Sequence, residues 1–225
     1  MMNHNIAVDG PAGAGKSTIA KLVAKKQQLI YVDTGAMYRA MGIYFSRLGV
    51  DPQDMEAVAC AAEGAEVSIE YREGVQQVIL NGENVTGILR TEEAGKNASK
   101  YSACAPVREK MVELQQKLAA KTAVIMDGRD IGTVVLPDAF LKVYLTASSA
   151  ERARRRYLEL TEKGETCDLI EIEKDIIARD HADMTRANSP LRQAEDAVLV
   201  DASDMSIDQV VDTIVSLYEE RMQGA

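Results

Sequence analysis

Several residue types are scarce in this chain. It has no tryptophan and two phenylalanines, so platforms for stacking the bases of a single-stranded nucleic acid are few. Two histidines, His4 and His181, are too few for a histidine-rich metal cluster. Three widely spaced cysteines fit reduced core thiols better than a disulfide framework or a zinc site. No apolar run approaches the ~18 residues that span a bilayer, and no signal peptide opens the chain. We therefore expect a soluble cytoplasmic protein that does not enter membranes.

The charge balance is acidic. The chain has 26 Lys and Arg against 35 Asp and Glu, a net charge of −9, which argues against a general nucleic-acid binder. Any site for an anionic ligand must therefore be local. With 225 residues, 46% hydrophobic and 27% charged, the chain has a globular composition and the length of one or two domains. Nothing in it demands more than a monomer.

Strand patterns alternate with helical patterns along most of the chain. Buried strands are expected at 5–9, 29–32, 123–126, 140–145 and 197–200. Helical patterns are expected up to about Lys26 and at about 36–48, 54–63, 91–102, 107–120, 148–163 and 169–186, with a last one opening at Ser206. This alternation predicts a three-layer α/β fold with a five-stranded parallel sheet covered on both faces.

One region departs from that alternation. Val67, Ile69 and Tyr71 alternate with polar residues, which is typical of a half-buried strand. A second strand is expected at 75–80, followed by the tight-turn dipeptide Asn81-Gly82. We expect a small antiparallel insert that ends near residue 91.

A glycine-rich segment follows the first strand. Residues 10–17 match the phosphate-loop pattern G-x-x-x-x-G-K-[ST], between a buried strand and a helix. Backbone N–H groups of such a loop converge on phosphate oxygens, Lys16 reaches the β- and γ-phosphates, and Ser17 ligates Mg²⁺. The alternative without a binding function is a glycine-rich turn with a solvated lysine. The expected ATP site comprises Gly10, Pro11, Ala12, Gly13, Ala14, Gly15, Lys16, Ser17 and Thr18.

Polar residues also follow the third buried strand. Asp127 stands at its carboxyl end, where open α/β sheets bind ligands, and there it could hold Mg²⁺ through bound water or simply cap a turn. Arg129 and Asp130 come directly after, and such a density of charge is costly unless a polar ligand uses it.

Arginines mark three further places. Arg39 stands in the first turns of a helix, against the preference of the helix dipole, and an anionic ligand would offset this; its neighbour Tyr38 could bind or pack. Arg152, Arg155 and Arg156 share a helix face, either around an anion or as a solvated basic face.

The third place lies further along the chain. Arg179, Asp183 and Arg186 are spaced i, i+4, i+7, either as a second polar binding cluster or as surface ion pairs. No Ser–His–Asp set, metal-ligand cluster or activated cysteine is visible. The chemistry indicated is phosphoryl transfer, which mostly needs positioning and charge neutralisation.

Four segments carry a more specific resemblance: 33–39 (DTGAMYR), 127–133 (DGRDIGT), 148–153 (SSAERA) and the insert at 80–91. Together they resemble the bacterial cytidylate kinase family over nearly the whole chain. The resemblance implies a P-loop kinase of ATP with Mg²⁺, acting on CMP or dCMP. It also implies a single kinase chain over 1–225, with a core at about 1–34, 104–150 and 191–225, a monophosphate-binding region with the β insert at 35–103, and a helical lid at 151–190.

The resemblance further implies residue roles. Thr34, where the family often has Ser, contacts the monophosphate with Tyr38 and Arg39. Ser99, Arg108 and Asp130 read cytosine, with Arg129 beside them. Arg179, Asp183 and Arg186 make lid and sugar contacts, and Arg152 and Arg156 approach the transferring phosphate. The alternatives are a related kinase of UMP, AMP or a metabolite such as shikimate, or a P-loop module that only binds ATP.

Overall fold

The computed structural model describes residues 4–224, which form two compact units. One unit comprises the chain up to Tyr31 and from Thr122 onward, and the other is Val32–Lys121. Among the described residues, no helix is long and apolar enough to cross a membrane.

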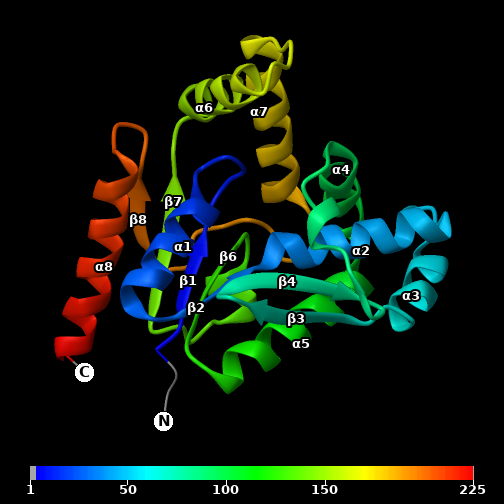
Figure 1. Ribbon diagram of the computed structural model, residues 1–225, viewed down its shortest axis with the longest axis horizontal. Helices are drawn as coiled ribbons and strands as arrows, with labels where there is room; N and C mark the ends of the chain where they lie inside the picture. The colour runs from blue at the N-terminus through cyan, green and yellow to red at the C-terminus, as the bar shows by residue number, and fades with distance from the viewer. Residues whose placement is uncertain (1–3, 225) are drawn as a thin grey trace. The chain divides into compact units, whose positions relative to one another are not determined.

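The first unit is built on a five-stranded sheet. Its order is β2 (Ile30–Asp33), β6 (Val124–Gly128), β1 (Ile6–Asp9), β7 (Leu141–Thr146) and β8 (Val198–Asp201). β1 pairs in parallel with β6 and β7, so that Ile6 lies opposite Ile125 on one side and Leu141 on the other. β7 in turn pairs in parallel with β8. The carboxyl ends of β1, β6 and β7 therefore share one edge, from which the phosphate loop departs (Figure 1).

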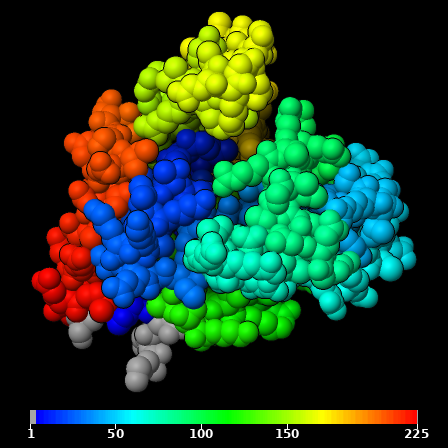
Figure 2. Space-filling view, viewed as in Figure 1, coloured from blue at the N-terminus to red at the C-terminus, as the bar shows by residue number. Residues whose placement is uncertain are grey.

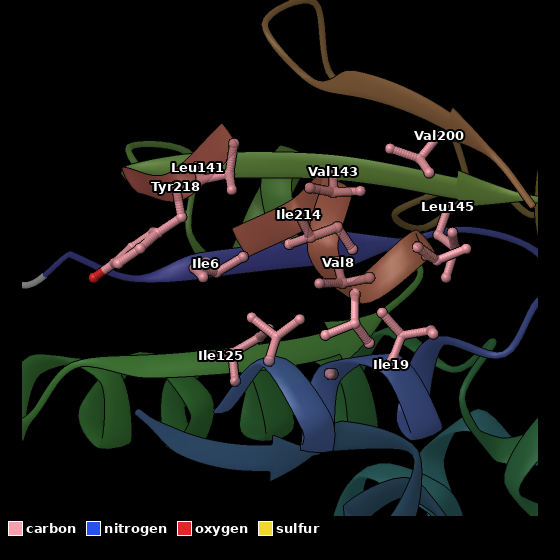
Figure 3. Close-up of a cluster of buried hydrophobic side chains, with 14 of the residues drawn as sticks. Ile6, Val8, Ile19, Ile125, Leu141, Val143, Leu145, Val200, Ile214 and Tyr218 are labelled. Carbon is pink, nitrogen blue, oxygen red and sulfur yellow. The ribbon is translucent and has the colours of Figure 1, made fainter. Parts of the chain in front are cut away.

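Two helices bury the apolar core of this sheet. α1 (Lys16–Gln27) and α8 (Ile207–Gly224) pack on each other and on the sheet. Ile19 of α1 and Ile214 of α8 meet Val8 of β1 in a cluster of fully buried side chains (Figure 3). α1 has no side-chain cap at its N-terminus; its N-cap is Gly15, in the left-handed region. Its last turn carries Lys25 and Lys26, which suit the negative end of the helix dipole.

A helical pair projects from the same unit. α6 (Ser149–Glu162) is capped by the Ser148 hydroxyl and α7 (Leu169–Thr185) by the Asp168 carboxylate. The two helices pack side by side and form the yellow-green to yellow lobe in Figure 2. One π-helical turn, Ile131–Val135, follows β6.

The second unit combines four helices with a small sheet. The helices are α2 (Thr34–Leu48), α3 (Met55–Glu63), α4 (Glu92–Tyr101) and α5 (Ala105–Lys121), with a 3₁₀ turn at Thr86–Ile88. The antiparallel sheet has the order β3 (Val67–Arg72), β4 (Val75–Leu80) and β5 (Glu83–Asn84). Positive φ angles of 48° at Asn81 and 81° at Gly82 match the predicted tight turn. α2 and α4 pack so closely that a Cβ at Gly42 would lie 2.8 Å from the Ala98 nitrogen.

The predicted α/β class, the five-stranded parallel sheet and the antiparallel insert are confirmed. α5 packs with α2 and α3 in the second unit, although the sequence places residues from 104 onward with the core. The limits of core, monophosphate-binding region and lid stay predictions. The expectation of core thiols is wrong in part: all three cysteines are free, but Cys104 is buried whereas Cys60 is exposed and Cys167 is half-buried. The π-helical turn and β5 were not predicted.

Candidate active site

The phosphate loop starts and ends on glycines that no other residue could replace without strain. Gly10 has a φ of 149°, and a Cβ there would lie 1.9 Å from the carbonyl oxygen of Leu145 at the end of β7. Gly15 has a φ of 88° and offers no side chain to the first N–H groups of α1. Those donors, with the positive end of the helix dipole, form a ready site for an anion.

Lys16 lies inside the loop. It is 5% exposed, and its Nζ atom donates to the carbonyl oxygens of Gly10 at 2.8 Å and Pro11 at 2.7 Å. The alternative of a solvated lysine is therefore wrong. Burial, followed by the charge of Arg129, lowers the pKa of Lys16 well below its usual range, while Asp127 acts in the opposite direction. A bound phosphate group would add further negative charge beside this buried lysine.

Ser17 and Asp127 lie together, as expected for a magnesium site. The Ser17 hydroxyl donates to Oδ2 of Asp127 at 2.8 Å, and the Tyr31 hydroxyl donates to Oδ1 at 2.8 Å. Both carboxylate oxygens are thus held in place on a residue that is 5% exposed. Hydroxyl and carboxylate oxygens are ligands that suit Mg²⁺, which keeps several waters. The residues present therefore fit the ion, although sequence reasoning missed Tyr31.

Arg129, Asp183 and Arg186 form one cluster. Nε of Arg129 lies 2.8 Å from Oδ2 of Asp183, and Nη1 of Arg186 lies 3.5 Å from its Oδ1. Burial alone would raise the pKa of Asp183, but the charges of Arg129, Arg186 and Arg179 outweigh it, and the pKa is lowered. The side chain of Asp183 is 14% exposed, so these are not surface ion pairs. Arg179 contributes charge from an exposed position on the same helix.

The arginines of α6 do not share an environment. Arg152 is 5% exposed, whereas the side chain of Arg156 is 49% exposed and pairs with Glu159 at 2.9 Å. Arg154 and Arg155 both bond to Glu151. These bonds, led by that of Arg154, lower the pKa of Glu151 to about 2. Of the three arginines expected on one helix face, Arg155 therefore has its anion within the protein, because Glu151 supplies it.

Five further predicted residues lie in the second unit: Thr34, Tyr38, Arg39, Ser99 and Arg108. Asp33 caps α2 by accepting from the Ala36 N–H at 2.8 Å, and Arg39 lies 3.9 Å from the same carboxylate. The guanidinium of Arg108 lies 5.3 Å from the ring centre of Tyr38, a cation–π contact.

The exposure of these residues differs. Thr34 and Arg108 are buried, and Nη1 of Arg108 donates to the Ser102 carbonyl at 3.0 Å. Ser99 is exposed on α4. The second unit therefore brings Tyr38 together with Arg108 but leaves Ser99 in solvent.

Comparison with known proteins decides the family. The family model for cytidylate kinase matches residues 6–220. This chain belongs to the cytidylate kinase family. A cytidylate kinase from Desulfitobacterium hafniense is 48% identical over 221 residues, covering 98% of this chain and 95% of the relative. One from Shouchella clausii is 49% identical over 216 residues, covering 96% of each. The predicted family resemblance is confirmed.

A solved structure supports the fold alone. The crystal structure of an uncharacterized protein from Eubacterium ventriosum has a TM-score of 0.53 at 10% identity, covering 97% of this chain and 99% of that one.

One buried carboxylate escaped the sequence analysis. Asp9 ends β1 directly before the phosphate loop and is 4% exposed. Its Oδ1 and Oδ2 atoms accept from the backbone N–H groups of Ile131 and Gly132, each at 2.7 Å. It thereby ties the start of the phosphate loop to the turn after Asp130, a residue to which the family resemblance gives a role. A charged residue at the end of an otherwise apolar buried strand was the signal available, since burial of an unsatisfied carboxylate is costly.

Asp9 should make the stability of this family member depend on pH. Burial raises its pKa from 3.8 to about 6, so the folded protein holds the proton more firmly than the unfolded chain. The free energy of unfolding should therefore fall as pH rises between those two values, by about 3 kcal/mol from this residue. Asp9→Asn has no such proton to lose, so denaturant titrations from pH 4 to pH 7 should show a flatter dependence. The exposed Asp138→Asn serves as control, and equal slopes in Asp9→Asn and the parent would contradict the assignment.

Proposed function

We propose that this chain transfers the γ-phosphoryl group of ATP to CMP or dCMP, giving ADP and CDP or dCDP, with Mg²⁺. The observation that carries the proposal is its 48% identity to a curated cytidylate kinase over nearly the full length of both chains. We also expect the chain to act in the cytoplasm as a monomer on these small molecules, with no nucleic acid involved.

The donor side rests on the phosphate loop. Backbone N–H groups at the start of α1 would bind the phosphates, and Lys16 would place a positive charge beside the phosphoryl group being transferred. Ser17 would ligate Mg²⁺, with Asp127 orienting the Ser17 hydroxyl at 2.8 Å. When bound, the ion would neutralise the negative charge that develops on the phosphates during transfer.

The acceptor side rests on the residue roles that the family resemblance implies. We assign Thr34, Tyr38 and Arg39 to the phosphate of CMP. Ser99, Arg108 and Asp130, with Arg129, are assigned to cytosine, and Arg179, Asp183 and Arg186 to the ribose and lid contacts. The cation–π contact of Tyr38 with Arg108 supports this assignment, because it places a residue assigned to the phosphate beside a residue assigned to cytosine.

Arg152 and Arg156 are assigned to the phosphoryl group in transfer. Arg156 pairs with Glu159 at the surface, where an ion pair holds little free energy, so its guanidinium can leave that partner at small cost. Arg152 uses three of its N–H groups on protein oxygens, which leaves two of the five donors of an arginine for phosphate.

One assay tests the function. ADP formation from ATP-Mg²⁺ is measured with CMP, dCMP, UMP, AMP and shikimate as acceptors. We expect turnover to depend on CMP or dCMP. Preference for another acceptor would assign the chain to a different kinase activity. Slow ADP formation at a rate independent of the acceptor would indicate a module that only binds ATP.

Asp183 and Arg156 should differ in their kinetic signatures. Asp183→Ala removes an acceptor for a ribose hydroxyl and leaves Arg129 and Arg186 without their shared carboxylate, so the KM for CMP should rise about tenfold or more. Arg156→Ala should instead lower kcat, because its charge is used when the phosphoryl group moves. Steady-state kinetics on both variants check this, and identical signatures would show that the division of roles is wrong.

A further inference from the structure

Arg152 joins three segments of the first unit. Its Nη1 atom donates to the carbonyl of Ala12 in the phosphate loop at 2.9 Å, and its Nε atom donates to the carbonyl of Ala147, just after β7, at 2.8 Å. Its Nη2 atom pairs with Oδ2 of Asp180 on α7 at 2.7 Å. A guanidinium that is 5% exposed thus connects the loop, the start of α6 and the middle of α7.

Asp180 balances the buried positive charge of Arg152. Within residues 4–224, Asp180 supplies the one ion pair of this buried guanidinium. The carboxylate of Asp180 is 13% exposed, and it makes no other hydrogen bond among the described residues. Removing one partner of such a pair leaves an uncompensated buried charge, which displaces the other partner or draws in water. The position of Arg152 therefore depends in part on α7.

The contact with Ala12 completes a pattern in the phosphate loop. The carbonyls of three consecutive residues accept from cationic side chains: Lys16 holds those of Gly10 and Pro11, and Arg152 holds that of Ala12. A Cβ on Gly13 would lie 3.5 Å from Cβ of Arg152, so this side chain lies directly beside the loop. A carbonyl engaged in this way is not turned toward a bound phosphate, which it would repel. While these carbonyls are held, the N–H groups of the loop remain available to a ligand.

We propose that Asp180 is a positioning residue for the donor nucleotide. It orients Arg152 against the Ala12 carbonyl and so keeps the phosphate loop in its phosphate-binding conformation. This role rests on the proposed function, since it places Asp180 on the donor side of the reaction. Asp183, one helical turn further along α7, is assigned to the acceptor side.

The test compares the binding of the two nucleotides. Calorimetric titrations give the Kd of ATP-Mg²⁺ and of CMP, each alone, for the parent, for Asp180→Asn and for the control Asp175→Asn, an exposed carboxylate of the same helix. We expect Asp180→Asn to weaken ATP binding and to lower kcat, together on the order of 10²-fold, because a small misplacement of the loop costs that much. CMP binding should not change, and Asp175→Asn should resemble the parent in every measurement.

A double mutant separates positioning from general stability. In an Arg152→Met background, the further change Asp180→Asn should weaken ATP binding no more, because its effect passes through Arg152. Asp180→Glu keeps the charge and should recover most of the ATP affinity lost in Asp180→Asn, so it carries the test if Asp180→Asn fails to fold.

Three results would overturn the proposal: unchanged ATP binding in Asp180→Asn, equal weakening of ATP and CMP, or additive losses in the double mutant. If the parent phosphorylates no nucleotide, the proposed function fails, but the ATP titrations still decide the role of Asp180.

Discussion

Lys16→Ala should fold, bind CMP and turn over on the order of 10²–10³ times more slowly than the parent, the usual loss for one preorganised electrostatic contact. Its ammonium lies among the carbonyls of Gly10 and Pro11, where its burial leaves little water to screen it. An interaction that strengthens as negative charge moves affects kcat more than the binding of the acceptor. The measurement is kcat with ATP-Mg²⁺ and CMP, together with the Kd of CMP.

Two comparisons make this result specific. Lys25→Ala removes an exposed lysine from the same helix and should keep the activity of the parent. Lys16→Met keeps the aliphatic part of the side chain and should be as slow as Lys16→Ala if the charge is what matters. Near-normal activity in either Lys16 variant would exclude the proposed role.

Asp130→Ala should lower kcat/KM for CMP by on the order of 10- to 100-fold. This loss corresponds to the free energy of one hydrogen bond to a charged group. Cytosine presents an amino donor where uracil presents an oxygen acceptor, and a carboxylate can accept only from the former. Asp130 is 3% exposed, and its backbone carbonyl accepts from Val134 and Val135, contacts that alanine preserves. The measurement is kcat/KM for CMP and for UMP.

The ratio of kcat/KM for CMP to kcat/KM for UMP decides the role of Asp130. If Asp130 reads the base, the preference for CMP over UMP should narrow, because the group that rejects uracil is gone. The exposed Asp138→Ala should leave the ratio unchanged. Equal losses with CMP and UMP would mean that Asp130 supports the site without reading the base.

Much of the fold follows from local patterns in the chain. The segment from β1 through α1 is predictable because an apolar strand, a glycine pattern and helical spacing stand side by side in the sequence. The turn at Asn81 and Gly82 is predictable because those two residue types tolerate positive φ. Gly49 ends α2 in the left-handed region for the same reason.

The partners of the polar side chains are not predictable in this way. Tyr31 bonds to Asp127 and Arg152 to Ala12, each across a long stretch of chain that no periodicity relates. Spacing placed Arg152 and Arg156 on one helix face, but it carries no information on which of them is buried. Asp180 lies three residues before Asp183 and looked like any other helical carboxylate, because its significance comes from Arg152 on a different helix.

The interruption of the first unit by the second has a consequence for how the chain folds as it is synthesised. The side chain of Asn5 bonds to the backbone of Val124, 119 residues later, and β1 has no neighbouring strand to pair with until β6 or β7 exists. At 5–20 residues per second, the first strand and its phosphate loop wait roughly 6 to 24 s for that partner. The residues of Val32–Lys121 are contiguous, so the whole second unit is synthesised before Val124. The phosphate loop is therefore among the first segments to be made, although the strand that precedes it acquires its partners much later.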